Sequence, residues 1–271
     1  MSEFRISPRM IAVIENEWAQ MRRNRVVMFT TFAPPFLFVA LALTVLFLSS
    51  WIEVNYASIE RVSSTLGGGL NKFPSVTRID AVRAALLSPF LLLFEMLPLV
   101  VPLTVASYSI VGEKQSRSLE TLLATPVRTW ELLTAKALAA AIPGVAATWG
   151  SFAIFLVAAR ITVSPVIYNN LILSRTWLVA ITLLTPIFTM FAVSLGIIVS
   201  SRVKDPQSAQ QLGSLIILPV IGIMVAQVLG AVDVDASAIL NAALFVGLAD
   251  IGLLFLAVRL FQREKILTGW K

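Results

Sequence analysis

Long apolar stretches separated by short polar segments dominate the chain. The hydrocarbon core of a membrane is about 30 Å thick and an α-helix rises about 1.5 Å per residue, so one crossing needs roughly 20 apolar residues. Six stretches meet this requirement: Met28–Ser50, Ala84–Ile110, Ala137–Ala159, Trp177–Ser201, Leu212–Val232 and Ala238–Val258. They lack the strict alternation of a barrel strand, so their backbone hydrogen bonds are best satisfied in helices. The pattern predicts an all-α integral membrane protein with six transmembrane helices.

Composition agrees with this pattern and indicates one domain. Hydrophobic residues make up 58% of the 271 residues and charged residues only 13%, and the mean hydropathy is +0.87. A water-soluble domain with that balance would aggregate. The longest polar connection, residues 51–83, is too small and too poor in apolar residues to form its own core. We therefore expect a single transmembrane domain over 1–271, with 51–83 as an external loop that carries short surface helices.

The segment before the first span predicts an amphipathic helix over residues 7–25. Ser7 and Pro8 suit the N-cap and the first position of a helix. The apolar face consists of Met10, Ile11, Ile14, Trp18 and Met21, and the polar face of Glu15, Glu17, Gln20 and Arg22. The helix ends in a basic cluster that contains Arg22 and Arg23. Such a helix lies in the membrane interface, either as a topology anchor or as a lever that also touches a cytoplasmic partner.

Lys and Arg are distributed unevenly among the connections, and this sets the orientation. Six crossings place both termini on one side, which holds 15 of the 21 basic residues. They are Arg5, Arg9, Arg22, Arg23, Arg25, Lys114, Arg117, Arg128, Lys136, Arg202, Lys204, Arg259, Arg263, Lys265 and Lys271. Positive connections stay in the cytoplasm, so we expect cytoplasmic termini in the cell membrane of a prokaryote. The net charge of +6 then reflects topology and contact with membrane lipids, with no nucleic-acid partner.

The residue types that the chain lacks exclude much of enzyme chemistry. It has neither Cys nor His, which removes disulfides, thiolate chemistry, His-assisted serine hydrolysis and the usual metal and haem sites. It also has no Gly-x-x-x-x-Gly-Lys-Ser/Thr loop to cradle nucleotide phosphates. We therefore expect no catalytic, cofactor or metal site, and if ATP powers the protein, a separate subunit binds it.

Two carboxylates, Glu95 and Asp250, fall inside predicted spans. A carboxylate in hydrocarbon is costly unless it is neutral, paired or facing a wet cavity. One interpretation places them on a translocation pathway or proton relay, with Pro98 able to bend the helix of Glu95 and Asn241 on the helix of Asp250. The other makes each carboxylate a hydrogen-bonding contact between neighbouring helices. The sequence leaves both interpretations open.

A polar insert over residues 111–136 interrupts the apolar pattern between the second and third spans. Ser118 is a candidate N-cap for a short helix that Pro126 ends, with Glu120 inside it. The apolar ridge of this helix consists of Leu119, Leu122 and Leu123. A second helix is expected to start near Thr129 and to continue into the third span. Exposed leucines at the water-facing end of a bundle indicate burial by a partner, or alternatively by the chain's own bundle.

At this insert the chain resembles the permease subunits of type-2 ATP-binding cassette exporters. The family pattern combines Gly-Glu-Lys/Arg, Gly-Thr-Leu-Glu, Leu-Leu and Ala/Ser-x-Pro-Val/Ile. It is matched by Gly112-Glu113-Lys114, Ser118-Leu119-Glu120, Leu122-Leu123 and Ala124-Thr125-Pro126-Val127. Arg117 departs from it, since the family usually has Gly there. The similarity extends to the N-terminal helix, the six-span layout and the segment 205–210, which looks like the family's polar entry into the fifth span.

The resemblance implies a half-transporter. Two permease subunits, identical or related, would pair with two copies of a cytoplasmic ATPase that holds ATP and Mg²⁺, and the insert would be the coupling helix. The implied coupling residues are Gly112, Glu113, Lys114, Arg117, Ser118, Leu119, Glu120, Leu122, Leu123 and Pro126. The implied contacts of the interfacial connecting helix are Ile11, Ile14, Trp18, Met21, Arg22 and Arg23. The resemblance also implies short re-entrant helices on the outer side, within 230–241, although Asp233 and Asp235 there fit a solvated turn equally well.

Two functions from other classes fit parts of the sequence. A proton-coupled secondary carrier would use Glu95 and Asp250 and would work without an ATPase, but it gives the insert no role. A non-transporting membrane scaffold or sensor would bind a partner through the insert without responding to a substrate. Few polar groups in the spans indicate an apolar pathway, and no feature of the sequence identifies the transported substrate.

Overall fold

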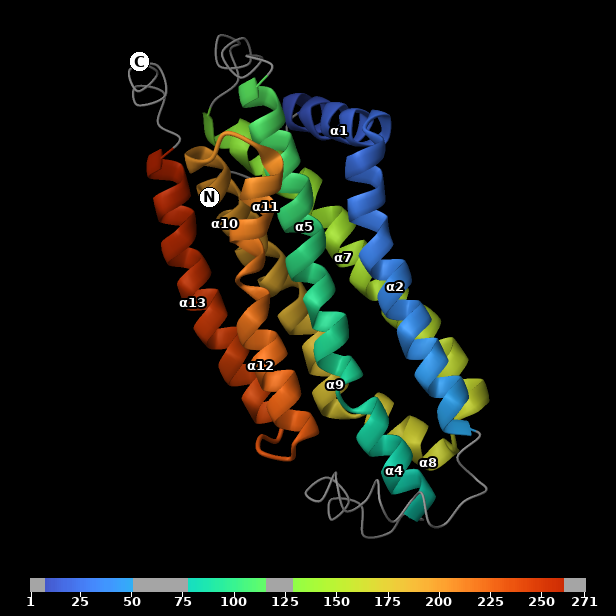
Figure 1. The fold of residues 1–271 in the computed structure, drawn as a ribbon. Coiled ribbons are helices and arrows are strands. Elements are labelled where there is room, and N and C mark those ends of the chain that lie inside the picture. The colour runs from blue at the N-terminus through green and yellow to red at the C-terminus, as the bar shows by residue number, and fades with distance from the viewer. Residues whose placement is uncertain (1–7, 51–77, 116–128, 261–271) are drawn as a thin grey trace.

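The computed structural model describes residues 8–50, 78–115 and 129–260. Within these ranges six helical stretches are long and apolar enough to cross a membrane. They are Arg25–Ser49, Arg83–Gln115, Glu131–Thr162, Arg175–Arg202, Pro206–Val228 and Ala236–Ala257. Figure 1 shows them as one elongated bundle of near-parallel helices. The predicted all-α, six-span architecture is confirmed, with most span boundaries displaced by a few residues.

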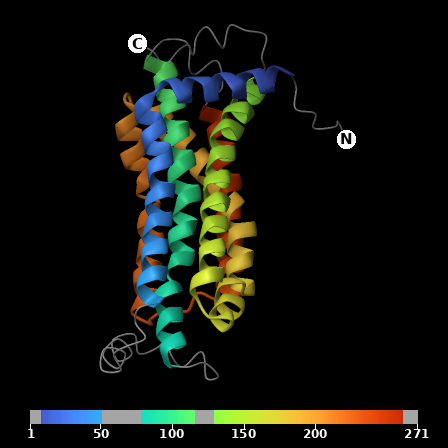
Figure 2. The same cartoon turned by 90° about the vertical axis from the view of Figure 1, so that its right-hand side faces the viewer.

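α1 (Pro8–Arg23) lies across one end of the bundle, and α2 (Arg25–Ser50) turns away from it along the bundle axis (Figures 1 and 2). Asn24 makes the turn. Its Oδ1 accepts hydrogen bonds from the backbone N–H groups of Val26 at 3.0 Å and Val27 at 3.3 Å, which caps α2. Ser7 lies outside the described residues, so its predicted role as the cap of α1 stays a prediction, as does the position of α1 in a membrane interface.

α5 (Phe90–Gln115) is the central helix, between α2 on one side and α12 (Ile217–Val228) on the other (Figure 1). It also contacts α7 (Thr129–Thr162), α10 (Thr185–Arg202) and α11 (Pro206–Ser214). The α4–α5 span is 67% buried over its most apolar window, compared with 11% for the α11–α12 span. A Cβ at Gly196 of α10 would lie 2.9 Å from the Cβ of Ala106. Small residues therefore let α5 and α10 approach closely.

Two spans are interrupted, each next to a proline. α4 (Arg78–Leu87) ends directly before Ser88-Pro89, and α5 starts directly after this pair. In the fifth span Pro219 has no N–H to donate to the carbonyl of Leu215, which accepts instead from Leu218 at 3.1 Å. α11 and α12 are separated at this point.

The end of the predicted external loop 51–83 is helical, because α4 begins at Arg78 and the second span begins at Arg83. Short helices were expected in this loop. Arg83 attaches this one to the bundle. Its guanidinium Nε donates to the backbone carbonyl of Ser49 at 3.0 Å, and the side chain is buried between α2 and α4. A charged residue that suggested a solvated loop is therefore part of the helical bundle. Residues 51–77, where short surface helices are expected, lie outside the described residues.

The fourth span contains a π-helix, η4 (Ala180–Leu184), between α9 (Arg175–Val179) and α10. Pro186 follows at the start of α10 and cannot donate a backbone hydrogen bond. The indole Nε1 of Trp149 on α7 donates to the carbonyl of Ile181 inside this π-helix at 2.9 Å. Before α9, the short helices α8 (Pro165–Ile167) and η3 (Tyr168–Ile172) complete the turn from α7.

The connection between the last two spans is a short turn between α12 and α13. Of the two conformations expected within 230–241, the structure has the turn and not the re-entrant helices. Gly230 has φ 72°, a left-handed conformation that ends the helix. Asp235 then caps α13 (Ala236–Leu260), since its Oδ1 accepts from the backbone N–H of Ala238 at 2.8 Å. These two stop and start signals leave only a few residues between the helices.

Candidate functional site

A cluster of buried charges lies where α1, α5 and α7 meet. Nζ of Lys136 on α7 forms ion pairs with Glu17 of α1 and, at 2.8 Å, with Glu113 of α5. The same ammonium donates to Oγ of Ser109 at 3.0 Å. The exposed fractions of Glu17, Glu113 and Lys136 are 6%, 4% and 6%. We call these three charged side chains the buried ion cluster.

The spacing of residues along α5 and α1 brings the members of the buried ion cluster together. Ser109 and Glu113 are four residues apart on α5 and so share a face, which is turned towards α7. On α1 the buried residues Met10, Ile14 and Glu17 recur at helical spacing. They lie against α7, where Met10 and Ile14 form an apolar cluster with two alanines, Ala135 and Ala139. The apolar contact thus places the carboxylate of Glu17 beside Lys136.

The predicted orientation of α1 needs a correction. Glu17 was expected on the polar face and is buried. Ile11, expected on the apolar face, is 47% exposed on the chain, so its contact with the membrane interface stays a prediction. The cause of the burial of Glu17 is that α1 packs on α7, so the buried face of α1 is turned towards the bundle. Trp18 supports this arrangement, because its Nε1 donates to the carbonyl of Ala139 at 3.0 Å. Met21 is half-buried, and Arg22 and Arg23 are exposed.

The end of α5 is attached on its other side to α10. Nζ of Lys114 donates to the backbone carbonyls of Ser201 at 3.3 Å and Val203 at 3.2 Å. Nε2 of Gln115 donates to the carbonyl of Lys204 at 3.0 Å. Carbonyls at a helix C-terminus lack partners within the helix, so the α5 side chains satisfy part of the end of α10. Neighbouring residues of α5 thus connect to α1 and α7 on one side and to α10 on the other.

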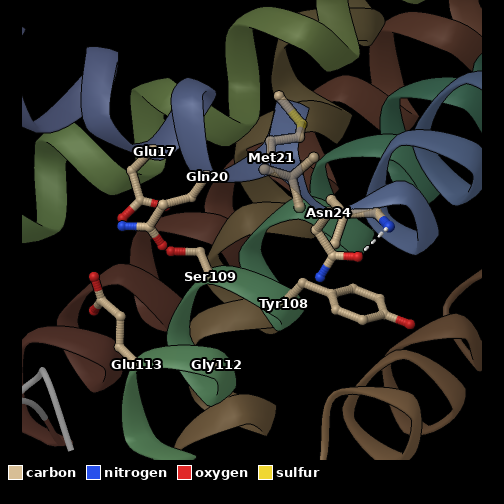
Figure 3. Close-up of a pocket in the computed structure, with 10 residues that line it drawn as sticks. Glu17, Gln20, Met21, Asn24, Tyr108, Ser109, Gly112 and Glu113 are labelled. Atoms are coloured by element: carbon tan, nitrogen blue, oxygen red, sulfur yellow. Dashed lines mark hydrogen bonds between the residues drawn. The ribbon is translucent and has the colours of Figure 1, made fainter. Parts of the chain in front are cut away.

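A recess of about 210 Å³ opens beside the ion cluster, between α1, α2 and α5 (Figure 3). Its lining consists of Glu17, Gln20, Met21, Asn24, Val27, Val105, Tyr108, Ser109, Gly112 and Glu113. Figure 3 shows Glu17 and Gln20 reaching down from α1 towards Ser109, with Glu113 below them on α5. A Cβ added at Gly112 would meet nothing within 4 Å. The packing of this chain therefore does not require glycine there.

The predicted coupling helix lies outside the described residues, in 116–128. This applies to Arg117, Ser118, Leu119, Glu120, Leu122, Leu123 and Pro126. The structure describes the two helices that flank it. α5 enters the segment at Gln115, and α7 leaves it at Thr129, where a second helix was predicted.

The two intramembrane carboxylates are held by different partners. Oγ1 of Thr185 donates to Oε1 of Glu95 at 3.0 Å, and Oγ of Ser194 donates to Oδ1 of Asp250 at 2.7 Å. Both hydroxyls belong to α10, nine residues apart. At about 100° per residue they project from opposite faces of that helix, one towards α5 and the other towards α13. The structure therefore does not bring Glu95 and Asp250 together.

The remaining candidates for a pathway are also dispersed. Pro98 is buried within α5, in an uninterrupted helix. Asn241 is exposed on α13, nine residues before Asp250 and so on the opposite face of the same helix. These residues form no common site in the part of the chain that the structure describes.

Sequence reasoning did not identify the central residue of the cluster, Lys136, or its partner Glu17. Lys136 was counted only as a positive residue near the membrane, and Glu17 as part of a polar helix face. The one available signal was a lysine two turns into a mostly apolar helix, whose other charges, Glu131 and Arg160, lie in its first and last turns. Its partner is 119 residues away in the chain, and no periodicity points to it.

Comparison with known protein families gives a match over most of the chain. A family model described as ABC-2 family transporter protein matches residues 55–257, which is 203 of the 271 residues. No curated protein matches the chain. The matched range contains five of the six spans and the segment 116–128. The chain is therefore a multi-pass membrane protein that belongs to the ABC-2 transporter family, whose members form the membrane component of a transporter.

Proposed function

We propose that the chain is the membrane-spanning subunit of an ATP-driven exporter. It forms the translocation pathway and couples, through residues 116–128, to a separate cytoplasmic ATPase that holds ATP and Mg²⁺. The observation that carries this proposal is the buried ion cluster. It joins α1 to α5 and α7, the two helices that enter and leave the segment 116–128.

The buried ion cluster connects the segment 116–128 rigidly to α1. Separating one member of a buried ion pair from its partner leaves an uncompensated charge and costs about 3–5 kcal/mol. A force on 116–128 therefore moves the ends of α5 and α7 together with α1. Lys114 extends the connection to the end of α10. Four helices thus respond to one contact with the ATPase.

The complete exporter in this proposal has two ATPase copies and a second permease subunit, which is a copy or a relative of this chain. Both termini and the 116–128 segment face the cytoplasm of the cell membrane. The surfaces of the α11–α12 span and of α13 support a second subunit, since these spans are only 11% and 17% buried and most of their exposed side chains are apolar. Such faces suit lipid or a neighbouring subunit.

The alternative of a proton-coupled carrier has less support. A relay between Glu95 and Asp250 would have to cross from one face of α10 to the other. Each carboxylate instead accepts a hydrogen bond from its own hydroxyl on α10, which favours their role as helix contacts. Membership of a transporter family likewise favours transport over a scaffold or sensor.

Co-purification tests the coupling directly. The full chain, tagged and extracted from its native membrane, should bring down an ABC ATPase that is identified by mass spectrometry. Glu120→Lys should reduce this recovery, because Glu120 lies in the predicted coupling helix. Glu53→Lys makes the same charge change in the predicted external loop and serves as the control. Loss of the ATPase in both variants, or in neither, would count against the coupling assignment.

Spin labels test whether α1 moves with the bundle. The chain has no Cys, so cysteines introduced at the exposed positions Ile11 of α1 and Ile142 of α7 are unique. In the complex with its ATPase, the distance between the labels should stay narrow and unchanged when nucleotide is added. Glu17→Gln should broaden it. A large nucleotide-dependent change in the unmodified cluster would mean that α1 and α7 do not move as one unit.

A further inference from the structure

Two arginine side chains at the turn between α1 and α2 have no partner in the part of the chain that the structure describes. Arg23 ends α1 and Arg25 begins α2. Both are exposed, and neither guanidinium forms a hydrogen bond or an ion pair with another described residue. Arg22 differs, because its Nε donates to the carbonyl of Trp18 at 3.3 Å. The turn therefore presents two guanidinium groups that are available to a ligand.

These two arginines line a shallow depression of about 500 Å³. Its lining consists of Gln20, Arg23, Asn24, Arg25 and Val26. The side-chain oxygen of Asn24 already accepts two backbone hydrogen bonds at the start of α2, so the Nδ2 amide group is the part of this side chain left to donate. The lining thus consists mainly of hydrogen-bond donors, which suits a ligand with several acceptor oxygens.

The sequence around the depression has a strong excess of positive charge. Arg22, Arg23 and Arg25 lie within four residues, and no Asp or Glu occurs between Glu17 and Glu53. Glu17 itself is buried in an ion pair with Lys136. Uneven charge of this kind attracts ligands of the opposite sign. The depression is therefore complementary to a group with a net negative charge.

The depression lies at the level where the first span begins. That span starts at Arg25, and Figure 2 shows α1 crossing the end of the bundle there while α2 runs away from it. Val26, Phe29 and Phe36 continue along one side of α2 and are 53%, 73% and 74% exposed. Long basic side chains at the ends of spans reach the headgroup region. Charge and apolar surface therefore follow one another as the headgroup and acyl chains of a phospholipid do.

We propose that the depression at the α1–α2 turn binds the headgroup of an anionic phospholipid, such as phosphatidylglycerol. The phosphate lies between Arg23 and Arg25, since guanidinium groups bind phosphate oxygens through parallel hydrogen bonds. The acyl chains follow α2 past Val26 and Phe29. A zwitterionic headgroup fits less well, because its own ammonium group would lie among the arginines. The bound lipid holds the α1–α2 turn at the membrane surface, and this binding does not depend on coupling to the ATPase.

The lipid dependence of thermal unfolding tests the proposal. The full chain, without other subunits, is placed in phosphatidylcholine nanodiscs that contain increasing fractions of phosphatidylglycerol or phosphatidylethanolamine. We expect Tm to rise by about 5 °C with phosphatidylglycerol, to level off once the site is filled, and to stay constant with phosphatidylethanolamine. Equal Tm values in phosphatidylglycerol and phosphatidylcholine, or an equal rise with phosphatidylethanolamine, would overturn the proposal.

Two double variants separate a site from general attraction to an anionic surface. Arg23→Gln with Arg25→Gln should remove most of the rise and leave Tm in pure phosphatidylcholine unchanged, since neither side chain has a described partner. Arg202→Gln with Lys204→Gln removes the same charge at the same spacing, at the same end of the bundle (Figure 1). This second variant should retain most of the rise. Equal losses in both would show that the lipid responds to total charge and would contradict a site.

Soluble anions and the ATPase are the other occupants to be distinguished. Inorganic phosphate or glycerophosphoglycerol, added at millimolar concentration to phosphatidylcholine nanodiscs, should not raise Tm. An equal rise with either compound would show that the depression takes a free phosphate and would overturn the assignment to a lipid. Arg23→Gln with Arg25→Gln should also leave recovery of the ATPase unchanged. Loss of the ATPase together with an intact rise in phosphatidylglycerol would assign these arginines to a protein interface instead.

Discussion

Buried acidic side chains occur in two regions of this protein, and they are stabilised differently. At the end of the bundle, Glu17 and Glu113 share the ammonium of Lys136. Inside the bundle, the described partner of Glu95 is the hydroxyl of Thr185, and that of Asp250 is the hydroxyl of Ser194. The first arrangement consists of ion pairs and the second of single hydrogen bonds.

The difference matches what each region can tolerate. The ion cluster lies near the ends of the spans, where three helices converge and each charge finds a partner of opposite sign. A full ion pair deep in hydrocarbon must overcome a larger desolvation cost, whereas one hydroxyl suits a carboxyl group there. The cluster therefore connects helices strongly at the end that carries the segment 116–128, and the carboxyl groups connect them weakly along the spans.

The largest effect is expected for Lys136→Met. Removal of the shared ammonium leaves two carboxylates buried next to each other, which should lower the free energy of unfolding by about 3–5 kcal/mol. Denaturant titration of the full chain in micelles measures this change. Lys136→Arg keeps the charge and should lose much less. Equal losses in both variants would mean that the length of the lysine, rather than its charge, holds the cluster.

At Glu95, the free energy of unfolding should depend mainly on the volume of the side chain. Glu95→Ala leaves a cavity around a fully buried position and removes the acceptor of Thr185, so we expect a loss of about 2–4 kcal/mol. Glu95→Gln keeps the size and an acceptor oxygen, and it should stay within about 1 kcal/mol of the original chain. The same titration measures both. A large loss in the glutamine variant would show that the charge of Glu95 is needed.

Glu17→Gln should have an intermediate effect. Lys136 keeps its ion pair with Glu113, and the glutamine oxygen can still accept a hydrogen bond. We expect the free energy of unfolding to fall by about 1–2 kcal/mol, in the range of hydrogen bonds to charged groups. Glu15→Gln, an exposed change on the same helix, is the control and should be neutral. A larger loss than in Lys136→Met would contradict the central place of the lysine.

The contact between Asp250 and Ser194 should be worth less. A double-mutant cycle with Asp250→Asn and Ser194→Ala isolates it, and we expect a coupling energy of about 1 kcal/mol. Unfolding of the two single variants and the double variant gives the four corners of the cycle. Coupling near zero would mean that the 2.7 Å hydrogen bond contributes nothing to stability.

The smallest effect belongs to the exposed carboxylates that cap helices. The backbone N–H of Ala238 and the hydroxyl of Ser237 hold the pKa of Asp235 below its ordinary value of 3.8. A lowered pKa contributes stability that is fully present above 3.8 and is lost as the pH falls through the folded-state pKa. Asp235→Asn should therefore flatten the decline in Tm below about pH 4. An unchanged pH profile would show that the cap does not contribute in this way.

The helices themselves follow closely from the sequence. The fifth span was predicted from Leu212, and the polar segment before it was recognised as an entry into that span. The structure starts the helix at Pro206, with Asp205 as its N-cap, since Oδ1 accepts from the N–H of Ser208 at 2.8 Å. Such signals are local, because a cap and its helix lie within a few residues. Arg83 at the start of the second span has its partner, the carbonyl of Ser49, on another helix, and no local signal shows this contact.

The site was predicted less completely. The end of α5, from Gly112 to Lys114, was singled out by its motif, and the structure gives two of these residues distinct partners. Glu113 pairs with Lys136, and Lys114 with carbonyls at the end of α10. The sequence offered no way to assign either contact, because both partners are distant in the chain. Lys136 lies beyond the segment 116–128, and the end of α10 lies further along.

By itself, the sequence determined that the chain crosses a membrane six times as helices, because hydrocarbon forces backbone hydrogen bonds to close within each span. It also determined where the polar insert lies and that Glu95 and Asp250 are in spans. Only the tertiary structure decided that Glu17 faces Lys136, that Glu95 and Asp250 are on opposite sides of α10, and that a recess opens under α1. These depend on how helices distant in the chain rotate and pack against one another, and helical periodicity defines a face without defining the neighbour that it meets.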